Sequence, residues 1–286
     1  MALDGDTPRG QDGRWAENDA DPILSTPLGL AIDPEDPDEA PMNRVVSLQL
    51  GAEELGGNGR LGVMTGITGT GKSILQRTLV NGLAYRYSPQ RVNFILASCF
   101  TWRPGVCPLA DLSRHPHVLH VSRLIGFDYR GGFGQVDWDG DVFWDAVNRE
   151  VERREKIIRD GYSDMADYRR RSGPMPDLVI IIDDLESLPL WQPEMVTKLN
   201  SLIRRSANLG VYCVLSSIII NQDYLRSIKD EIGYGVTFGS YGASEMEFIA
   251  PREVENLTPS TGVGFFQTSR GEVEKVKVFE GVGGGS

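Results

Sequence analysis

Residues 66–73 read Gly-Ile-Thr-Gly-Thr-Gly-Lys-Ser and match the phosphate-binding pattern G-x-x-x-x-G-K-[ST] in full. The apolar run Leu61–Met64 precedes them and can form a buried strand, and residues 74–84 space their apolar side chains along one helical face. In this context the N–H groups of a glycine-rich turn converge on phosphate oxygens at a helix N-terminus. The motif therefore predicts a nucleoside triphosphate site, and it requires a sheet with helices packed against it.

Each polar residue of this motif has an expected task. Lys72 is expected to reach the β- and γ-phosphates, and the Ser73 hydroxyl is expected to coordinate Mg²⁺. The remaining contacts to ATP are predicted from the residues of the turn itself, which are Gly66, Thr68, Gly69, Thr70 and Gly71.

A second half of the site is predicted at the end of the apolar run Leu178–Asp183, which is typical of a strand buried on both faces. Asp183 is expected to hold Mg²⁺ through its water shell. Asp184 stands where many ATPases carry a glutamate that polarises the attacking water, and Glu186 follows two residues later. The alternative is that both aspartates cap a following helix.

The other apolar segments predict the fold class. Strands alternate with the helices expected over 141–160 and 195–208, which predicts an α/β fold with a doubly wound, mostly parallel sheet. Two pairs of strands are expected as antiparallel additions. The expected strands are 92–97, 118–121, 178–183 and 211–215, with the pairs 28–32 and 45–50, and 265–268 and 273–279.

Composition divides the chain into three parts. Residues 1–26 are rich in Asp, Glu, Gly and Pro and are expected to form a disordered acidic arm. Residues 27–280 are expected to form a single domain, and residues 281–286 are expected to form a Gly/Ser linker or tail.

Charge and cysteine content exclude some classes of protein. The net charge of −11, from 40 acidic and 29 basic residues, argues against nonspecific nucleic-acid binding. No apolar stretch approaches the roughly 20 residues of a membrane span, so a cytoplasmic soluble domain is expected, attached to a membrane only through a parent protein.

The three cysteines, Cys99, Cys107 and Cys213, are expected to be reduced. The histidines at 115, 117 and 120 favour a turn rather than a metal site.

Several short segments occur in an order that resembles the FtsK/SpoIIIE family of P-loop ATPases, especially the cytoplasmic ATPase modules of the type VII secretion EccC proteins. The similarity runs from Pro27 to Phe279. After the phosphate-binding motif, the segments that carry it are Tyr87–Leu96 with its Ser-Pro step, Leu109–Val118, Glu150–Glu155, Asp167–Arg170 and Ser206–Tyr212.

The resemblance implies a RecA-like fold, sibling ATPase modules in tandem or in a ring, and export of small WXG-type protein substrates. It also implies an arginine inserted from a neighbouring module, for which Arg204 and Arg205 are the candidates. The alternative is that both arginines are solvated charges that favour the C-terminal end of a helix.

The sequence also departs from this family. Asp183-Asp184 replaces the usual Asp-Glu, and residues 216–219 carry no Gln or Arg as a polar sensor. The intact phosphate-binding motif predicts that ATP binds, and these departures predict that its hydrolysis is slow or absent. Three functions remain open: a nucleotide-binding module of a type VII secretion motor, a non-hydrolysing module that docks a substrate's C-terminal tail, and, against the acidic charge, a DNA translocase.

Overall fold

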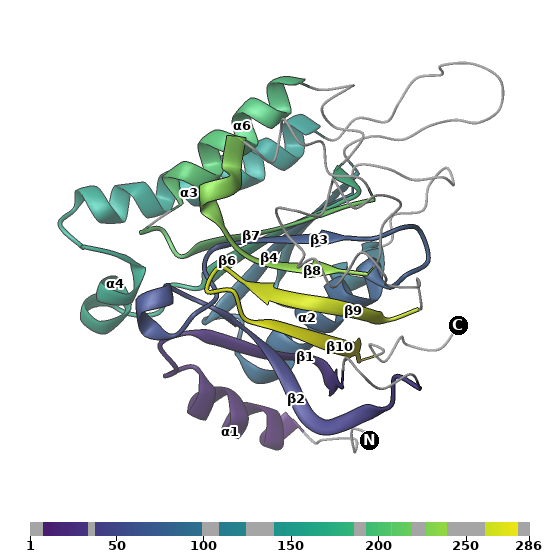
Figure 1. Ribbon diagram of the computed structural model, residues 1–286. Helices are drawn as coiled ribbons and strands as arrows, with labels where there is room; N and C mark the ends of the chain where they lie inside the picture. Colours follow the sequence, from purple (N-terminus) through teal and green to yellow (C-terminus); the bar gives the residue numbers. More distant parts are fainter. Residues whose placement is uncertain are drawn as a thin grey trace.

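The computed structural model describes residues 8–33, 38–98, 109–123, 140–185, 193–206, 208–218, 227–238 and 261–279. These residues form a ten-stranded sheet in the order β2-β1-β10-β9-β8-β3-β7-β6-β4-β5. The sheet crosses the whole molecule, and Figure 1 shows its strands from β7 near the top to β2 at the bottom. The predictions for Cys99, Cys107, Glu186 and residues 281–286 lie outside the described residues.

Six neighbouring strands of the sheet are parallel, and they carry the segments around the predicted nucleotide site. Strand β6 lies between β4 and β7, and all seven of its residues are buried, as its apolar sequence predicts. The mostly parallel α/β sheet is thus confirmed. The six strands are β3 (Leu61–Thr65), β4 (Val92–Ser98), β5 (Val118–Arg123), β6 (Asp177–Asp183), β7 (Val211–Ser217) and β8 (Ile232–Thr237).

Four antiparallel strands extend the sheet beyond β8. The two predicted pairs form, and β1 joins them by pairing with β10, so strands from the two ends of the chain are neighbours. The structure adds β8, which the sequence did not predict because Gly233 and Gly235 interrupt its apolar pattern. The four strands are β1 (Leu24–Ile32), β2 (Pro41–Leu50), β9 (Val263–Thr268) and β10 (Val273–Val278).

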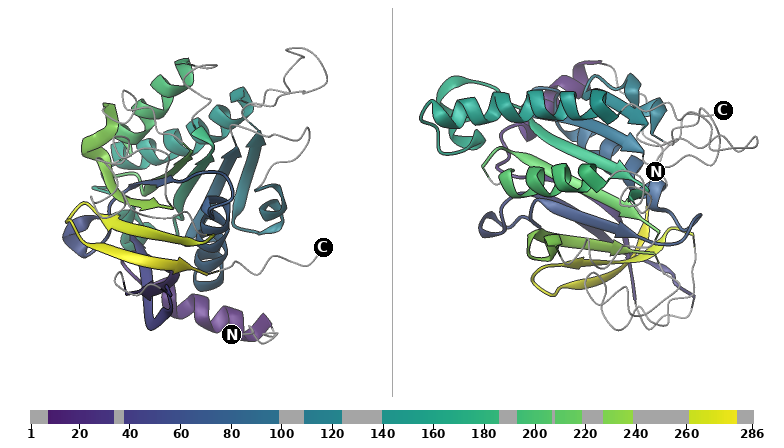
Figure 2. Two further views of the ribbon diagram at one scale, coloured as in Figure 1. Left: turned by 45° about the vertical axis from the view of Figure 1, so that its right-hand side comes forward. Right: turned by 90° about the horizontal axis from the view of Figure 1, so that it is seen from above.

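Helices cover both faces of the sheet, as Figures 1 and 2 show. Helix α2 (Lys72–Arg86) packs on one face, and α3 (Gly140–Arg159) and α6 (Pro193–Arg205) lie together on the other. Shorter helical segments connect the strands. They are α4 (Met165–Ser172) and the 3-10 turns η1 (Glu53–Leu55), η2 (Ala110–Arg114) and η4 (Lys229–Glu231). None of the described helices is both long and apolar enough to cross a membrane.

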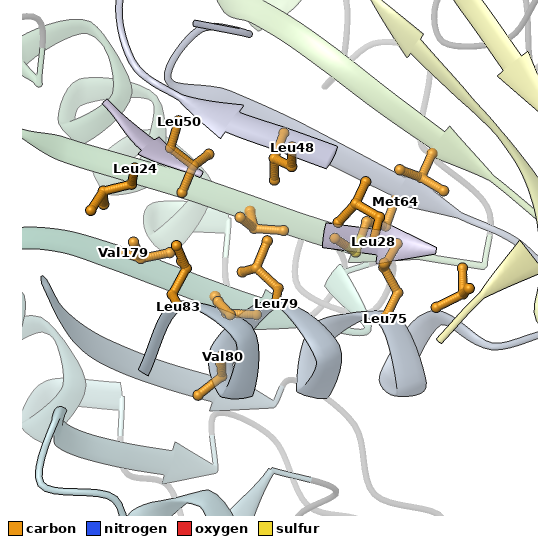
Figure 3. Close-up of a cluster of buried hydrophobic side chains, with 14 of the residues drawn as sticks. Leu24, Leu28, Leu48, Leu50, Met64, Leu75, Leu79, Val80, Leu83 and Val179 are labelled. Atoms are coloured by element: carbon orange, nitrogen blue, oxygen red, sulfur yellow. The ribbon is translucent and has the colours of Figure 1, made fainter. Parts of the chain in front are cut away.

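Two apolar clusters fix these helices to the sheet. Figure 3 shows how Leu75, Leu79 and Leu83 of α2 point toward leucines of β1 and β2. Each leucine that is buried in this way contributes roughly 1.5–3 kcal/mol relative to an exposed one. The helix that follows the glycine-rich turn is therefore held firmly, and its first residues have a defined position.

The N-terminal segment differs from the expectation of a disordered arm over residues 1–26. Residues 8–18 form helix α1, and β1 begins at Leu24. The indole Nε1 of Trp15 donates to the carbonyl oxygen of Ala84 (3.3 Å), and Asn18 Nδ2 donates to that of Arg86 (3.1 Å). A polar segment without a strong helical pattern is thus ordered by tertiary contacts, which composition does not reveal.

The side chains of Cys213 and His117, for which a reduced thiol and a turn were expected, are both buried in the core. Cys213 is a free thiol, and burial raises its pKa to about 12, so it stays protonated and unreactive. His117 Nε2 lies 2.8 Å from the carbonyl oxygen of Tyr87, and its ring meets that of Trp15 edge-on at 5.7 Å. Burial lowers the pKa of His117. This histidine therefore joins α1, the end of α2 and the segment before β5.

Candidate nucleotide site

The glycine-rich turn connects the end of β3 to the start of α2. Gly66, Gly69 and Gly71 adopt φ values of 152°, 87° and 124°, where side chains other than glycine are strained. A Cβ added to Gly69 would meet nothing within 4 Å, whereas one added to Gly71 would lie 3.2 Å from Gly262 Cα. The turn is thus open at its tip and crowded at its base, as a cradle for an incoming phosphate requires.

The polar residues of the turn lie together, as the motif predicts. Lys72 is buried, and its Nζ donates to the carbonyl oxygen of Gly66 at 2.7 Å, which leaves two donors of the ammonium for a ligand. Thr70 Oγ1 donates to the carbonyl oxygen of Ile67 at 2.7 Å and braces the turn from inside. Thr68 is exposed at the tip, and Ser73 is half-buried in the first turn of α2. Their roles toward ATP stay predictions.

A segment from the far end of the chain braces the same turn. The Gly262 N–H donates to the carbonyl oxygen of Thr70 (2.7 Å), and Thr261 Oγ1 donates to that of Gly69 (3.4 Å). Lys277 Nζ in turn donates to the carbonyl oxygen of Thr261 (2.7 Å). The sequence does not predict a role for these residues, since nothing in their local pattern indicates that they meet a turn about 190 positions earlier.

Asp183 ends β6 and is 1% exposed. Its Oδ1 accepts hydrogen bonds from Gln76 Nε2 of α2 (2.9 Å) and from Ser216 Oγ of β7. Its Oδ2 is buried and has no hydrogen-bond partner among the described residues, and the same holds for Gln76 Oε1. The structure thus places a carboxylate oxygen that has no donor among the described residues beside the helix that carries Ser73.

These residues fit Mg²⁺. A buried anionic oxygen is costly unless it is paired, and Mg²⁺ prefers oxygen ligands and keeps waters that can donate to a nearby carboxylate. Ser73 and Asp183 would hold the ion, and when bound it would supply positive charge to the phosphates. The alternative helix-capping role of Asp183 and Asp184 concerns the chain after Leu185, where residues 186–192 lie outside the described residues.

Asp184 has an unusual backbone conformation. Its φ is 55°, in the left-handed region that aspartate tolerates better than most residues, and its N–H donates to Ser216 Oγ at 3.2 Å. Non-glycine residues in this region carry strain of about 1–3 kcal/mol and often lie at functional sites. The sequence indicated no Gln or Arg sensor after Leu215. The structure shows that the shorter Ser216 lies at this point and contacts both acids.

Arg204 and Arg205 lie far from the glycine-rich turn of their own chain. They form the last turn of α6, just before Gly210, whose carbonyl oxygen accepts from Leu178 N at the start of β6 (2.8 Å). The seven residues of β6 separate its N-terminal end, beside Gly210, from Asp183 at its C-terminal end by about 20 Å. Arg205 pairs with Glu155 (2.5 Å), and Arg204 donates to the carbonyl oxygen of Ser227 (3.1 Å). Their expected role at the nucleotide site of a neighbouring module stays a prediction.

Comparison with known proteins places this architecture in a class. The model of the FtsK/SpoIIIE family matches residues 45–127, which include the glycine-rich turn and α2. The cytoplasmic domain of the Thermomonospora curvata type VII secretion ATPase EccC aligns over 92% of this chain and 29% of its own, with a TM-score of 0.74 and 24% identity. The fold is therefore that of a P-loop ATPase domain, with antiparallel strands added at one edge of the sheet.

The relatives in sequence are EccC proteins of type VII secretion systems. The ESX secretion system protein EccC of T. curvata is 28% identical over 253 residues, covering 85% of this chain. EccC5 of the Mycobacterium marinum ESX-5 system is 28% identical over 230 residues, covering 75%. The chain is homologous to ATPase domains of EccC proteins, and the predicted resemblance to the FtsK/SpoIIIE family and its EccC modules is confirmed.

The chain spans less than a fifth of these relatives, 18% and 15% of their lengths. A second solved structure contains ATPases 2 and 3 of T. curvata EccC in complex with a signal sequence peptide. It aligns over all of this chain and 46% of its own, with a TM-score of 0.68 and 25% identity. One module of a multi-ATPase protein is thus the unit with which this chain compares.

Proposed function

We propose that this chain is an ATP- and Mg²⁺-binding module of a type VII secretion ATPase, which couples its nucleotide state to export of WXG-type protein substrates. The observation that carries the proposal is the open glycine-rich turn with the buried Lys72 ammonium at its base. Asp183 supports it, since its Oδ2 lacks a donor among the described residues. The homology to EccC ATPase domains supplies the link to secretion.

The test of nucleotide binding is a calorimetric titration of ATP with Mg²⁺ into the wild type and Lys72→Ala. A charged hydrogen bond is worth roughly 1.5–3 kcal/mol, so the variant should bind ATP about 10- to 100-fold more weakly. Lys156→Ala removes an exposed lysine of α3 and should leave the affinity unchanged. Equal affinity in the wild type and Lys72→Ala would remove the basis for this site.

A further part of the proposal is that the isolated chain hydrolyses ATP slowly or not at all. The carboxylate of Asp184 is one methylene shorter than that of glutamate, and misplacement by about 1 Å can cost on the order of 10²-fold in rate. Arg204 and Arg205 lie near the N-terminal end of β6, opposite to Asp183, and would serve a neighbour's site rather than their own. Nucleotide that co-purifies with the chain should therefore be identified by mass as intact ATP.

A second candidate is a recognition module that binds ATP structurally and docks the C-terminal tail of a substrate. It is favoured by the related EccC structure that contains a signal sequence peptide. The two candidates differ in turnover and in partner. Measured phosphate release favours the motor, whereas retained ATP together with saturable binding of a WXG-type substrate tail, followed by fluorescence anisotropy, favours the recognition module. Absence of binding to both sibling modules and tails would contradict the proposed partners.

A further inference from the structure

We propose that Gln76 and Ser216 are positioning residues for Asp183, and that they set the affinity of the nucleotide site for its divalent cation. The inference rests on the proposed nucleotide binding. It assigns roles to two side chains that lie outside the glycine-rich turn and outside the pair of acids. Both side chains are fully buried, and both donate to the same oxygen of Asp183.

The position of Gln76 in α2 is the first observation. The helix buries Leu75, Leu79 and Val80 against the sheet, and Gln76 is buried among them with 0% exposure. A buried amide costs stability unless it is hydrogen-bonded, and this one bonds to Asp183. It follows Ser73 by three residues, so the two side chains lie on the same face of the helix. Gln76 thus links the helix that carries one predicted cation ligand to the strand that carries the other.

The distribution of donors on Asp183 is the second observation. Oδ1 accepts from both Gln76 and Ser216, so its two lone pairs are used. Rotation of the carboxylate would break both bonds at once. The hydrogen bonds therefore fix the plane of the carboxylate and leave Oδ2 as the oxygen available to a ligand.

The third observation is a pair of acceptors for which the described part of the chain offers no donor. Asp183 Oδ2 and Gln76 Oε1 are both buried, and neither has a partner within the described part of the chain. Because these two acceptors belong to side chains that are hydrogen-bonded to each other, one ligand that supplies O–H donors or positive charge could satisfy both. The water shell of a hard divalent cation supplies both, which is the chemistry that Mg²⁺ and Mn²⁺ share.

Ser216 adds a connection to the second acid. Its hydroxyl donates to Asp183 and accepts from the backbone N–H of Asp184, at 3.2 Å. The left-handed backbone of Asp184 and the orientation of Asp183 are therefore coupled through one hydroxyl group. Loss of this hydroxyl would disturb the cation site and the direction of the Asp184 side chain together.

The experiment compares two affinities for each variant, that for ATP in EDTA and that of the ATP-bound protein for Mn²⁺, followed by electron paramagnetic resonance. Groups that orient metal ligands typically contribute 10- to 100-fold to metal affinity, so Gln76→Leu should weaken Mn²⁺ binding by about that factor. Ser216→Ala should act in the same direction. The affinity for ATP in EDTA should change by less than about threefold in both, since neither residue belongs to the glycine-rich turn that is proposed to hold the phosphates.

The matched control is Gln90→Leu, the same substitution at an exposed position beyond the end of α2. It should leave both affinities unchanged. A purely structural role of Gln76 would weaken ATP and Mn²⁺ binding in parallel, and that result would overturn the inference, as would unchanged Mn²⁺ affinity in a folded Gln76→Leu or Ser216→Ala protein. A wild type that binds no ATP in either condition would instead contradict the proposed function.

Discussion

Replacing Gly71 by alanine tests whether the base of the glycine-rich turn is as tightly packed as the structure indicates. Gly71 has a φ of 124°, and an added Cβ would lie 3.2 Å from Gly262 Cα and 3.3 Å from Gly262 N. Gly262 cannot move aside freely, because its N–H donates to Thr70 (2.7 Å) and its carbonyl oxygen accepts from Val278 (2.8 Å). The substitution therefore combines backbone strain with pressure on two hydrogen bonds.

Gly69→Ala separates these two effects. Its φ of 87° is also positive and strains a side chain, although less than the 124° of Gly71, and an added Cβ meets nothing within 4 Å. Strain of this kind costs about 1–3 kcal/mol, and loss of one hydrogen bond about 0.5–1.5 kcal/mol. The free energy of unfolding should thus fall by about 1–2 kcal/mol in Gly69→Ala and by about 1 kcal/mol more in Gly71→Ala.

Urea denaturation followed by tryptophan fluorescence measures both changes, provided that the m-values of the two variants agree with that of the wild type. Hydrogen exchange of the Gly262 amide gives an independent readout and should accelerate in Gly71→Ala alone. Equal losses of stability in the two variants would refute the reasoning, since the contact with Gly262 would then carry no energy.

Two further predictions concern individual side chains. Burial lowers the pKa of His117, so His117 takes up a proton at higher pH in the unfolded state than in the folded state, and the free energy of unfolding should fall as the pH drops below about 6.5. His117→Gln should lose this pH dependence. If the pH dependence is retained in the variant, it belongs to other groups. Steady-state phosphate release should be slow in the wild type and unchanged in Asp184→Asn, whereas Asp184→Glu should raise its rate. Rapid turnover in the wild type that Asp184→Asn abolishes would show that Asp184 is already a competent catalytic residue.

Much of the parallel half of the fold could be predicted from the sequence, because buried parallel strands are continuous apolar runs. Strand β6 is the clearest example, and the helix predicted over 141–160 forms as α3 over Gly140–Arg159. Strand β8 could not be predicted, because close backbone contacts require glycine there. A Cβ on Gly233 would lie 2.2 Å from the carbonyl oxygen of Asn58. The apolar pattern is lost for this packing reason.

The candidate site was predictable where a local motif defines it and not where distant residues complete it. Residues 66–73 and Asp183 follow from local pattern alone. Gln76 reads as an ordinary polar residue in a helix, and only the folded chain shows that it reaches Asp183, 107 positions later. The segment at Thr261–Gly262 meets Gly69 and Thr70 only through the antiparallel extension of the sheet. Long-range contacts of this kind leave no periodicity in the sequence.

Both ends of the described chain are attached to the helix that begins at the glycine-rich turn. Trp15 and Asn18 bond to carbonyl groups of its last turn, and the hydroxyl of Thr78 donates to the carbonyl oxygen of Phe279 at its middle (2.7 Å). Helix α2 has 15 residues, about 22 Å of nearly rigid rod. A force that pulls α1 and the end of β10 apart would act on this helix at its last turn and at its middle, and the helix begins at Lys72. Mechanical load on the chain and the geometry of its phosphate cradle are therefore linked through a single helix.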